Sequence, residues 1–301
     1  MEETLPMGLN SLLLYGLTVS IWGTTWLAIK FQLGTVDPMV SVVYRFACAG
    51  LLLLCYCRVR RLPMRFRFGE HLYLALQGAF LFGVNYWLTY LAEVYLASGL
   101  VAVVFSTLVL WNIINGALLL RSPVRPFVVL AALIGLSGIG ILFWPEIKAF
   151  SLSDRAFFGL LLSIAATMSS SMGNILSARN QKARLPVIQS NAYGMSYGAV
   201  LIGILAFLSG KEFSFDVSWS YGVSLFYLAV FGSIIAFGSY LTLIGRIGAD
   251  RAAYASMLFP VVALGISTAY EGYRWSVPAL AGVTLIIAGN LIVLNRKSLA
   301  S

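Results

Sequence analysis

The sequence predicts an all-α membrane protein with ten transmembrane helices in two inverted five-helix repeats. Three observations support this prediction. First, 60% of the 301 residues are hydrophobic and only 10% are charged, whereas an ordinary soluble domain has about 25% charged residues. Second, ten apolar stretches have the length of about 20 residues that a bilayer crossing requires. Third, basic residues gather after every second stretch, as the positive-inside rule describes.

The predicted spans follow one another with short connections. The first is expected to be retained, because Glu2 and Glu3 replace the basic region of a signal peptide and no small-residue cleavage site follows. Links 93–95 and 246–251 are so short that the spans they join must be antiparallel neighbours. The ten spans are 10–30, 38–57, 71–92, 96–120, 125–144, 156–178, 187–208, 221–245, 252–271 and 277–295.

The +9 net charge is distributed unevenly across the predicted membrane. The basic residues assigned to the cytoplasmic side are Arg58, Arg60, Arg61, Arg65, Arg67, Arg121, Arg125, Arg179, Lys182, Arg184, Arg246, Arg251, Arg296 and Lys297. The outer side has Lys30, Lys148, Arg155, Lys211 and Arg274. We therefore expect both termini in the cytoplasm and the protein in a bacterial inner membrane, with lipid and not nucleic acid as its charged partner.

The short links divide the chain into two parts of five spans each, residues 1–150 and 151–301. An odd number of spans places the second part in the opposite orientation to the first. Inverted repeats of this kind are common in secondary transporters, where the substrate binds between the repeats near the middle of the bilayer.

Several segments are similar to one known family. Residues 20–30 (SIWGTTWLAIK) resemble the first-helix signature of the drug/metabolite transporter superfamily, EamA type. Further resemblances lie at Tyr44-Arg45-Phe46, at 96–102, from Ile247 to Pro260 and at Ala288-Gly289. The resemblance implies ten helices, two inverted repeats and export of small metabolites, amino acids or drugs through a central cavity. The family's Leu-Gly-Glu after helices four and nine is reduced here to Tyr270-Glu271-Gly272 and Leu119-Leu120-Arg121.

The sequence contains no pattern typical of an enzyme or of a metal site. His71 is the only histidine, and Cys48, Cys55 and Cys57 all belong to the second span. Neither residue type has the spacing of a metal site or an activated nucleophile. We therefore expect no catalytic residues, no metal and no cofactor.

Polar and aromatic residues recur at helical spacing inside the spans and are candidates for the wall of a substrate cavity. They are Trp22, Thr25, Asn85, Tyr86, Tyr90, Trp111, Asn112, Asn115, Ser170, Asn174, Tyr240 and Tyr254. Such a cavity suits a small zwitterion or an aromatic side chain, and it would also suit a lipophilic cation. A structural interpretation remains open for each residue, since polar side chains also join membrane helices and aromatic residues form interfacial belts.

Four further residues are candidates for gating or structural support: Arg45, Glu93, Pro260 and Glu271. Arg45 lies within the second span, roughly 10 Å from its outer end at a rise of 1.5 Å per residue. We expect it to act as a clamp that bonds outer-side backbone carbonyls or Glu93. Pro260 should kink the ninth span.

Small residues predict close contacts between helices. Gly135, Gly138 and Gly140 lie in the fifth span, and Gly194 and Gly198 form a Gly-xxx-Gly pair in the seventh. We expect contacts within one chain, in a monomer or a weak homodimer.

The sequence thus predicts a secondary transporter that exports small metabolites, foremost amino acids including hydrophobic and aromatic ones, by alternating access. The alternatives are a multidrug or quaternary-cation exporter and, without transport, a membrane receptor or scaffold. Because no Asp or Glu lies deep within a span, we expect the substrate to move down its own gradient, or coupling at the mouth through Glu93 or Glu271, in place of a buried proton relay.

Overall fold

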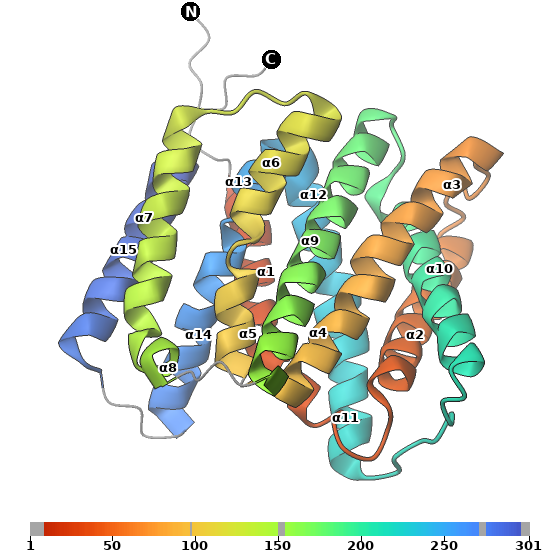
Figure 1. Cartoon of the computed structure of the whole chain (residues 1–301). Coiled ribbons are helices and arrows are strands. Elements are labelled where there is room, and N and C mark those ends of the chain that lie inside the picture. The colour runs from red at the N-terminus through yellow and green to blue at the C-terminus, as the bar shows by residue number, and fades with distance from the viewer. Residues whose placement is uncertain (1–8, 97, 150–153, 271–274, 296–301) are drawn as a thin grey trace, which may run out of the picture.

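The computed structural model describes residues 9–96, 98–149, 154–270 and 275–295, and all regular elements in these residues are helical (Figure 1). In the first part of the chain they are α1 (Leu9–Lys30), α2 (Pro38–Val59), α3 (Phe68–Gln77), η1 (Gly78–Val84), α4 (Asn85–Tyr95), α5 (Ser98–Phe105), α6 (Leu108–Leu120), α7 (Pro126–Leu142) and α8 (Trp144–Ala149). The second part has α9 (Asp154–Lys182), α10 (Val187–Leu208), α11 (Trp219–Tyr227), η2 (Leu228–Ile235), α12 (Ala236–Ile247), α13 (Ala249–Ala252), α14 (Ala255–Tyr270) and α15 (Val277–Asn295).

Seven helical stretches of the described residues have the length and apolar composition needed to cross a membrane. They are Leu9–Lys30, Pro38–Val59, Leu100–Leu120, Arg155–Lys182, Val187–Leu208, Trp219–Ile247 and Val277–Leu294. The predicted spans 71–92, 125–144 and 252–271 are mostly helical where described but fall outside this set; Pro126–Leu142, for example, is apolar but shorter. The all-helical membrane class is therefore confirmed, and the count of ten spans stays a prediction.

The helices pair across the two parts of the chain. At one edge of the bundle α7 packs along α15, and at the other α2 packs along α10 (Figure 1). Between these edges, α9 lies against η1 and α4 on one side and against α6 on the other, while α1 lies against η2 and α12 and against α14. The first helix of each part, α1 or α9, thus packs against the equivalent helices of the other part. This is the arrangement expected of two copies of one repeat.

Two π-helical segments interrupt equivalent helices of the two parts, η1 between α3 and α4 and η2 between α11 and α12. In each segment one carbonyl accepts a hydrogen bond from another helix. The carbonyl of Phe80 accepts from the Ser169 hydroxyl at 2.7 Å, and that of Gly232 accepts from the Trp22 indole N–H at 2.9 Å. Because lipid offers backbone groups no partner, irregular turns at membrane depth need such donors. Short π-helical segments of this kind occur often at functional sites.

Glycines allow the closest helix contacts. A Cβ at Gly78 would lie 2.2 Å from the carbonyl oxygen of Gly194, so η1 and α10 touch backbone to backbone. Gly138 of α7 and Gly282 of α15 meet in the same way, with a Cβ at Gly138 only 2.6 Å from the Gly282 carbonyl oxygen. These glycines therefore serve contacts within the chain, as expected, while Gly140 faces open space.

A matched pair of substitutions on α7 tests this packing. Gly138→Ala should destabilise the protein by about 1–3 kcal/mol, the usual cost of overpacking, and lower the midpoint of thermal unfolding in detergent. Gly140→Ala has nothing within 4 Å of the added Cβ and should be neutral or slightly stabilising, since alanine is the better helix former. Equal shifts for the two variants would contradict the contact between α7 and α15.

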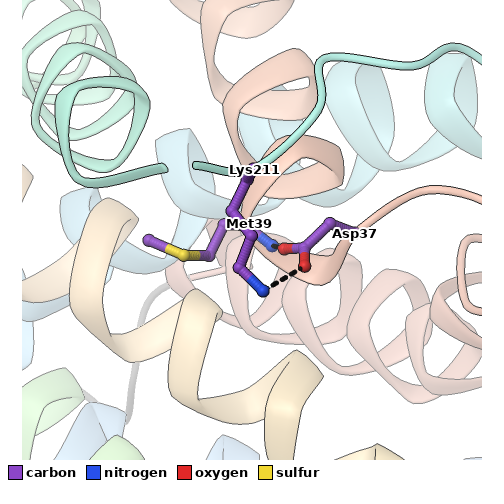
Figure 2. A network of polar contacts seen from close by, with 3 residues as sticks. All are labelled: Asp37, Met39 and Lys211. Atoms are coloured by element: carbon purple, nitrogen blue, oxygen red, sulfur yellow. Dashed lines mark hydrogen bonds and ion pairs between the residues drawn. The ribbon is translucent and has the colours of Figure 1, made fainter. Parts of the chain in front are cut away.

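Asp37 precedes α2 and caps its N-terminal end. Its Oδ1 accepts a hydrogen bond from the Met39 backbone N–H at 2.9 Å, and its Oδ2 pairs with Lys211 Nζ at 2.9 Å. Figure 2 shows Lys211 reaching across to Asp37 from the segment after α10. The carboxylate thus caps α2 and also joins the start of α2 to the segment that follows α10.

The cap and the ion pair can be separated by substitution. The Lys211 side chain is 42% exposed, and exposed pairs contribute about 0–1 kcal/mol, so Lys211→Met should change the unfolding midpoint little. Asp37→Ala removes the cap as well and should cost about 1 kcal/mol more. Asp37→Asn retains a capping acceptor and should have the same unfolding midpoint as Lys211→Met. A fall in the midpoint as large as that of Asp37→Ala would show that the ion pair, and not the cap, provides most of the stability.

Candidate functional site

A small cavity lies at the centre of the bundle, between helices of both parts of the chain. It measures about 40 Å³, and since a water needs about 10–15 Å³ of such volume, it has room for about three waters. The helices must therefore separate before a metabolite can enter. Its lining residues are Trp22, Thr25, Trp26, Ile29, Asn85, Tyr86, Thr89, Phe105, Leu108, Ser170, Asn174, Phe237, Tyr240 and Phe259.

Trp22 forms the aromatic wall of this cavity together with α12 and α14. Its ring centroid lies 4.7 Å from that of Phe237, 5.0 Å from Tyr240 and 5.6 Å from Phe259. The edge-to-face arrangement with both phenylalanines is the favoured geometry of aromatic pairs. Its indole N–H also donates to the Gly232 carbonyl, so Trp22 is held by three rings and one hydrogen bond while it lines the cavity.

A layer of hydrogen-bonded side chains closes one end of the cavity. The Asn174 amide nitrogen donates to the Tyr240 hydroxyl at 3.1 Å and to Asn112 Oδ1 at 3.4 Å. The Asn112 amide nitrogen donates in turn to the Ala249 carbonyl at 2.9 Å. We call Asn112, Asn174 and Tyr240 the polar layer; it joins α6, α9, α12 and the start of α13.

Beyond the polar layer lies a wide vestibule of about 660 Å³. Asn112 borders it, together with the ends of α6, α9 and α12. Its charged lining residues are Arg121, Arg125, Lys182, Arg246 and Asp250, four cations against one anion. The polar layer thus borders both, since Asn112 lines the basic vestibule and is bonded to Asn174, which lines the cavity.

Arg45 lies behind the opposite wall of the cavity and is fully buried. Its Nε donates to the Ser233 hydroxyl at 3.0 Å and its Nη1 to the Tyr90 hydroxyl at 3.5 Å. The guanidinium carbon lies 4.3 Å from the centroid of the Tyr86 ring, a cation–π distance. The expectation that Arg45 bonds backbone carbonyls or Glu93 is wrong. Instead, η2 places Ser233 against α2. The Ser233 hydroxyl donates to the Leu228 carbonyl, so the hydroxyl oxygen is free to accept from Arg45.

The comparisons with known proteins agree with this architecture. The model of the EamA-like transporter family matches residues 10–144 and again residues 157–295. The chain belongs to the EamA-like transporter family. This confirms the resemblance to EamA-type members of the drug/metabolite transporter superfamily and places two repeats in one chain.

Individual relatives of this EamA-like transporter cover nearly its whole length. It is 29% identical over 282 residues to the uncharacterized inner membrane transporter YedA of Escherichia coli K12, covering 92% of this chain and 88% of that protein. It is 24% identical over 285 residues to a probable amino-acid metabolite efflux pump of Salmonella typhimurium, covering 91% of each. A crystal structure titled only as that of a protein has the same fold, with a TM-score of 0.77, 20% identity and 94% and 95% coverage. These names describe transporters, not enzymes.

Of the twelve residues predicted for the cavity wall of this EamA-like transporter, the structure places seven on it: Trp22, Thr25, Asn85, Tyr86, Ser170, Asn174 and Tyr240. The other five lie elsewhere. Tyr90 bonds Arg45 and Asn112 belongs to the polar layer. Asn115 donates to Ser171 at 2.9 Å, and Tyr254 donates to the Val128 carbonyl. Trp111 lines a separate groove with Leu160 and Ile164.

Seven further residues line the cavity: Trp26, Ile29, Thr89, Phe105, Leu108, Phe237 and Phe259. Trp26 and Thr89 share helix faces with Trp22 and Asn85, and this spacing predicts them as lining residues too. The apolar residues resemble lipid-facing ones in sequence and gave no such indication.

The remaining candidates for gating or structural support are Glu93, Pro260 and Glu271. Both carboxylate oxygens of Glu93 are buried and have no hydrogen-bond partner among the described residues. Pro260 lies inside α14 beside the cavity residue Phe259. Glu271 lies outside the described residues. Within those residues no three His, Cys, Asp or Glu side chains group as metal ligands would.

Proposed function

We propose that this protein is a secondary transporter that exports amino acids, including hydrophobic and aromatic ones, from the bacterial cytoplasm. In this proposal ten helices cross the inner membrane with both termini in the cytoplasm, and the two repeats open the central cavity to each side in turn. The observation that carries it is the cavity between the repeats, with its aromatic wall and its few amide and hydroxyl groups.

The wall chemistry suits an amino acid. Trp22, Phe237 and Phe259 offer apolar and aromatic surface for a side chain, while Asn85 and Ser170 offer oxygen acceptors for an ammonium group and N–H or O–H donors for a carboxylate. Binding sites for small molecules commonly combine apolar walls with few polar groups that fix the orientation. The probable amino-acid metabolite efflux pump of Salmonella supports the same class of substrate.

The charge distribution supports the placement of the vestibule on the cytoplasmic side. The basic vestibule carries the residues that the positive-inside rule assigns to the cytoplasm, so substrate would enter there and pass the polar layer. In the described structure the cavity measures only about 40 Å³, so it must widen before it can hold an amino acid. The substrate moves down its own gradient, or its transport is coupled at the mouth through Glu93 or Glu271.

The quaternary-cation alternative has weaker support. The residues that line the cavity include no Asp or Glu, so a permanent cation would lack a counter-charge, and four cations of the vestibule would repel it on entry. A receptor or scaffold needs no such cavity.

Reconstitution tests the proposal. Proteoliposomes loaded with labelled L-phenylalanine or L-leucine should lose label far faster than protein-free liposomes, and a labelled quaternary ammonium compound should not. Faster release of the quaternary compound alone would support the alternative exporter. Release at the protein-free rate for every compound would favour the receptor or scaffold.

A further inference from the structure

Arg45 is a buried cation with only neutral partners. Its side chain is 0% exposed, and its hydrogen bonds go to the hydroxyls of Ser233 and Tyr90. Among the described residues, an ion pair is found between Lys211 and Asp37 and none is found at Arg45. Removing an ion from water costs several kcal/mol when nothing compensates it, and two hydroxyl acceptors could be served by a neutral amide. The positive charge is therefore not explained by the contacts within this region.

One end of the guanidinium is also unused. Nη2 is buried and has no hydrogen-bond partner among the described residues. A Cβ placed on Gly232 would lie 3.3 Å from this nitrogen and 3.0 Å from the Thr25 methyl group. Since Thr25 lines the cavity, the free donor lies about one side chain behind the cavity wall.

The group between Arg45 and the cavity is the Tyr86 ring. It lies 4.3 Å from the guanidinium carbon and also lines the cavity. An aromatic face attracts a cation through its ring electrons alone, whereas a carboxylate offers charge-assisted hydrogen bonds, which are among the strongest in proteins. The ring thus holds the cation while the cavity is empty and can be exchanged for a stronger partner.

We propose that Arg45 is a specificity-determining residue that binds the carboxylate of the substrate once the cavity has expanded and Tyr86 has moved aside. A carboxylate has two oxygens that match the parallel N–H donors of a guanidinium, of which Nη2 is free and Nη1 has only a 3.5 Å contact to release. The inference rests on the proposed function and assigns recognition of the substrate carboxylate, a group that amino acids share with other small carboxylates, to Arg45. Binding supplies the missing counter-charge to a cation that is otherwise unpaired.

The test compares an acid with its uncharged amide. In proteoliposomes that exchange labelled L-phenylalanine, 3-phenylpropionate should compete at least about tenfold better than 3-phenylpropanamide, a difference of about 1.4 kcal/mol. Arg45→Gln should remove this preference, and Arg45→Lys should retain it in weaker form, because lysine keeps the charge without the planar fork. The matched control is Arg58→Gln, an exposed arginine of the same helix, which should keep the preference of the unmodified protein.

Equal competition by acid and amide in the unmodified protein would overturn the inference, even if Arg45→Gln did not fold. A preference that persists in a folded Arg45→Gln variant would overturn it as well. If L-phenylalanine were not exchanged at all, the proposed function would fail separately. The same pair of ligands then decides by thermal unfolding of the purified protein: stabilisation by the acid alone supports the role of Arg45, and absent or equal stabilisation contradicts it.

Discussion

Trp22→Ala is expected to abolish transport. Trp22 contacts Phe237, Tyr240 and Phe259 and bonds the carbonyl of Gly232, so it supplies both the aromatic wall and the link between α1 and η2. Replacing a buried tryptophan with alanine costs about 3–5 kcal/mol in protein cores. We expect the rate of efflux of labelled L-phenylalanine from proteoliposomes to fall by more than about tenfold. A tenfold fall requires an increase of only about 1.4 kcal/mol in the activation free energy of transport.

Two variants separate the cavity role from a general loss of aromatic volume. Trp22→Phe keeps a ring but leaves the Gly232 carbonyl without its donor, so it should retain partial activity at a stability cost of about 1–3 kcal/mol. Trp111→Ala removes an equally large side chain from the separate groove beside Leu160 and should leave efflux largely unchanged. If Trp111→Ala reduced transport as much as Trp22→Ala, the cavity would not be the site.

Asn174→Ala is expected to open the cavity toward the vestibule. The substitution removes the donor that joins Tyr240 and Asn112, so the closed polar layer loses two hydrogen bonds. A loss of about 1–2 kcal/mol corresponds to a factor of about 5–30 in the population that is open. In a variant without native cysteines, the thiol of Ser170→Cys should therefore react about 5–30 times faster with a reagent added on the vestibule side.

Asn115→Ala is the control for this experiment. It removes a hydrogen bond to Ser171 on the same pair of helices and does not touch the polar layer, so thiol reactivity should stay within about twofold of the parent. Unchanged reactivity in Asn174→Ala would mean that the polar layer does not control access to the cavity.

The sequence predicts the helical class and the family well because both depend on long apolar stretches and local motifs. Polar residues within spans were informative too, since an amide such as Asn85 or Asn174 needs a partner in lipid and faces the interior. Thus most of the polar lining was predictable. The two repeats followed from the short links and the count of spans.

The rest depends on geometry that residue types do not encode. Nothing in the apolar segments of η1 and η2 distinguishes a π turn from an α turn, so the Ser233 partner of Arg45 could not be predicted. The rotation of α6 is equally hidden, because Trp111 and Asn112 are neighbours in the sequence and both are candidates for the cavity wall. In the structure Asn112 reaches the cavity boundary while Trp111 lies in a separate groove. Phe237 and Phe259 become recognisable only once Trp22 packs between them.

The central claim, one cavity opened to each side of the membrane in turn, is tested most directly by side-specific labelling of a cavity residue. In a cysteine-free protein with Thr25→Cys, a membrane-impermeant thiol reagent is applied to proteoliposomes of known orientation, from the inside or from the outside. We predict modification from both sides, slowed in each case by saturating L-phenylalanine. Modification from a single side under every condition, with no protection by substrate, would contradict alternating access.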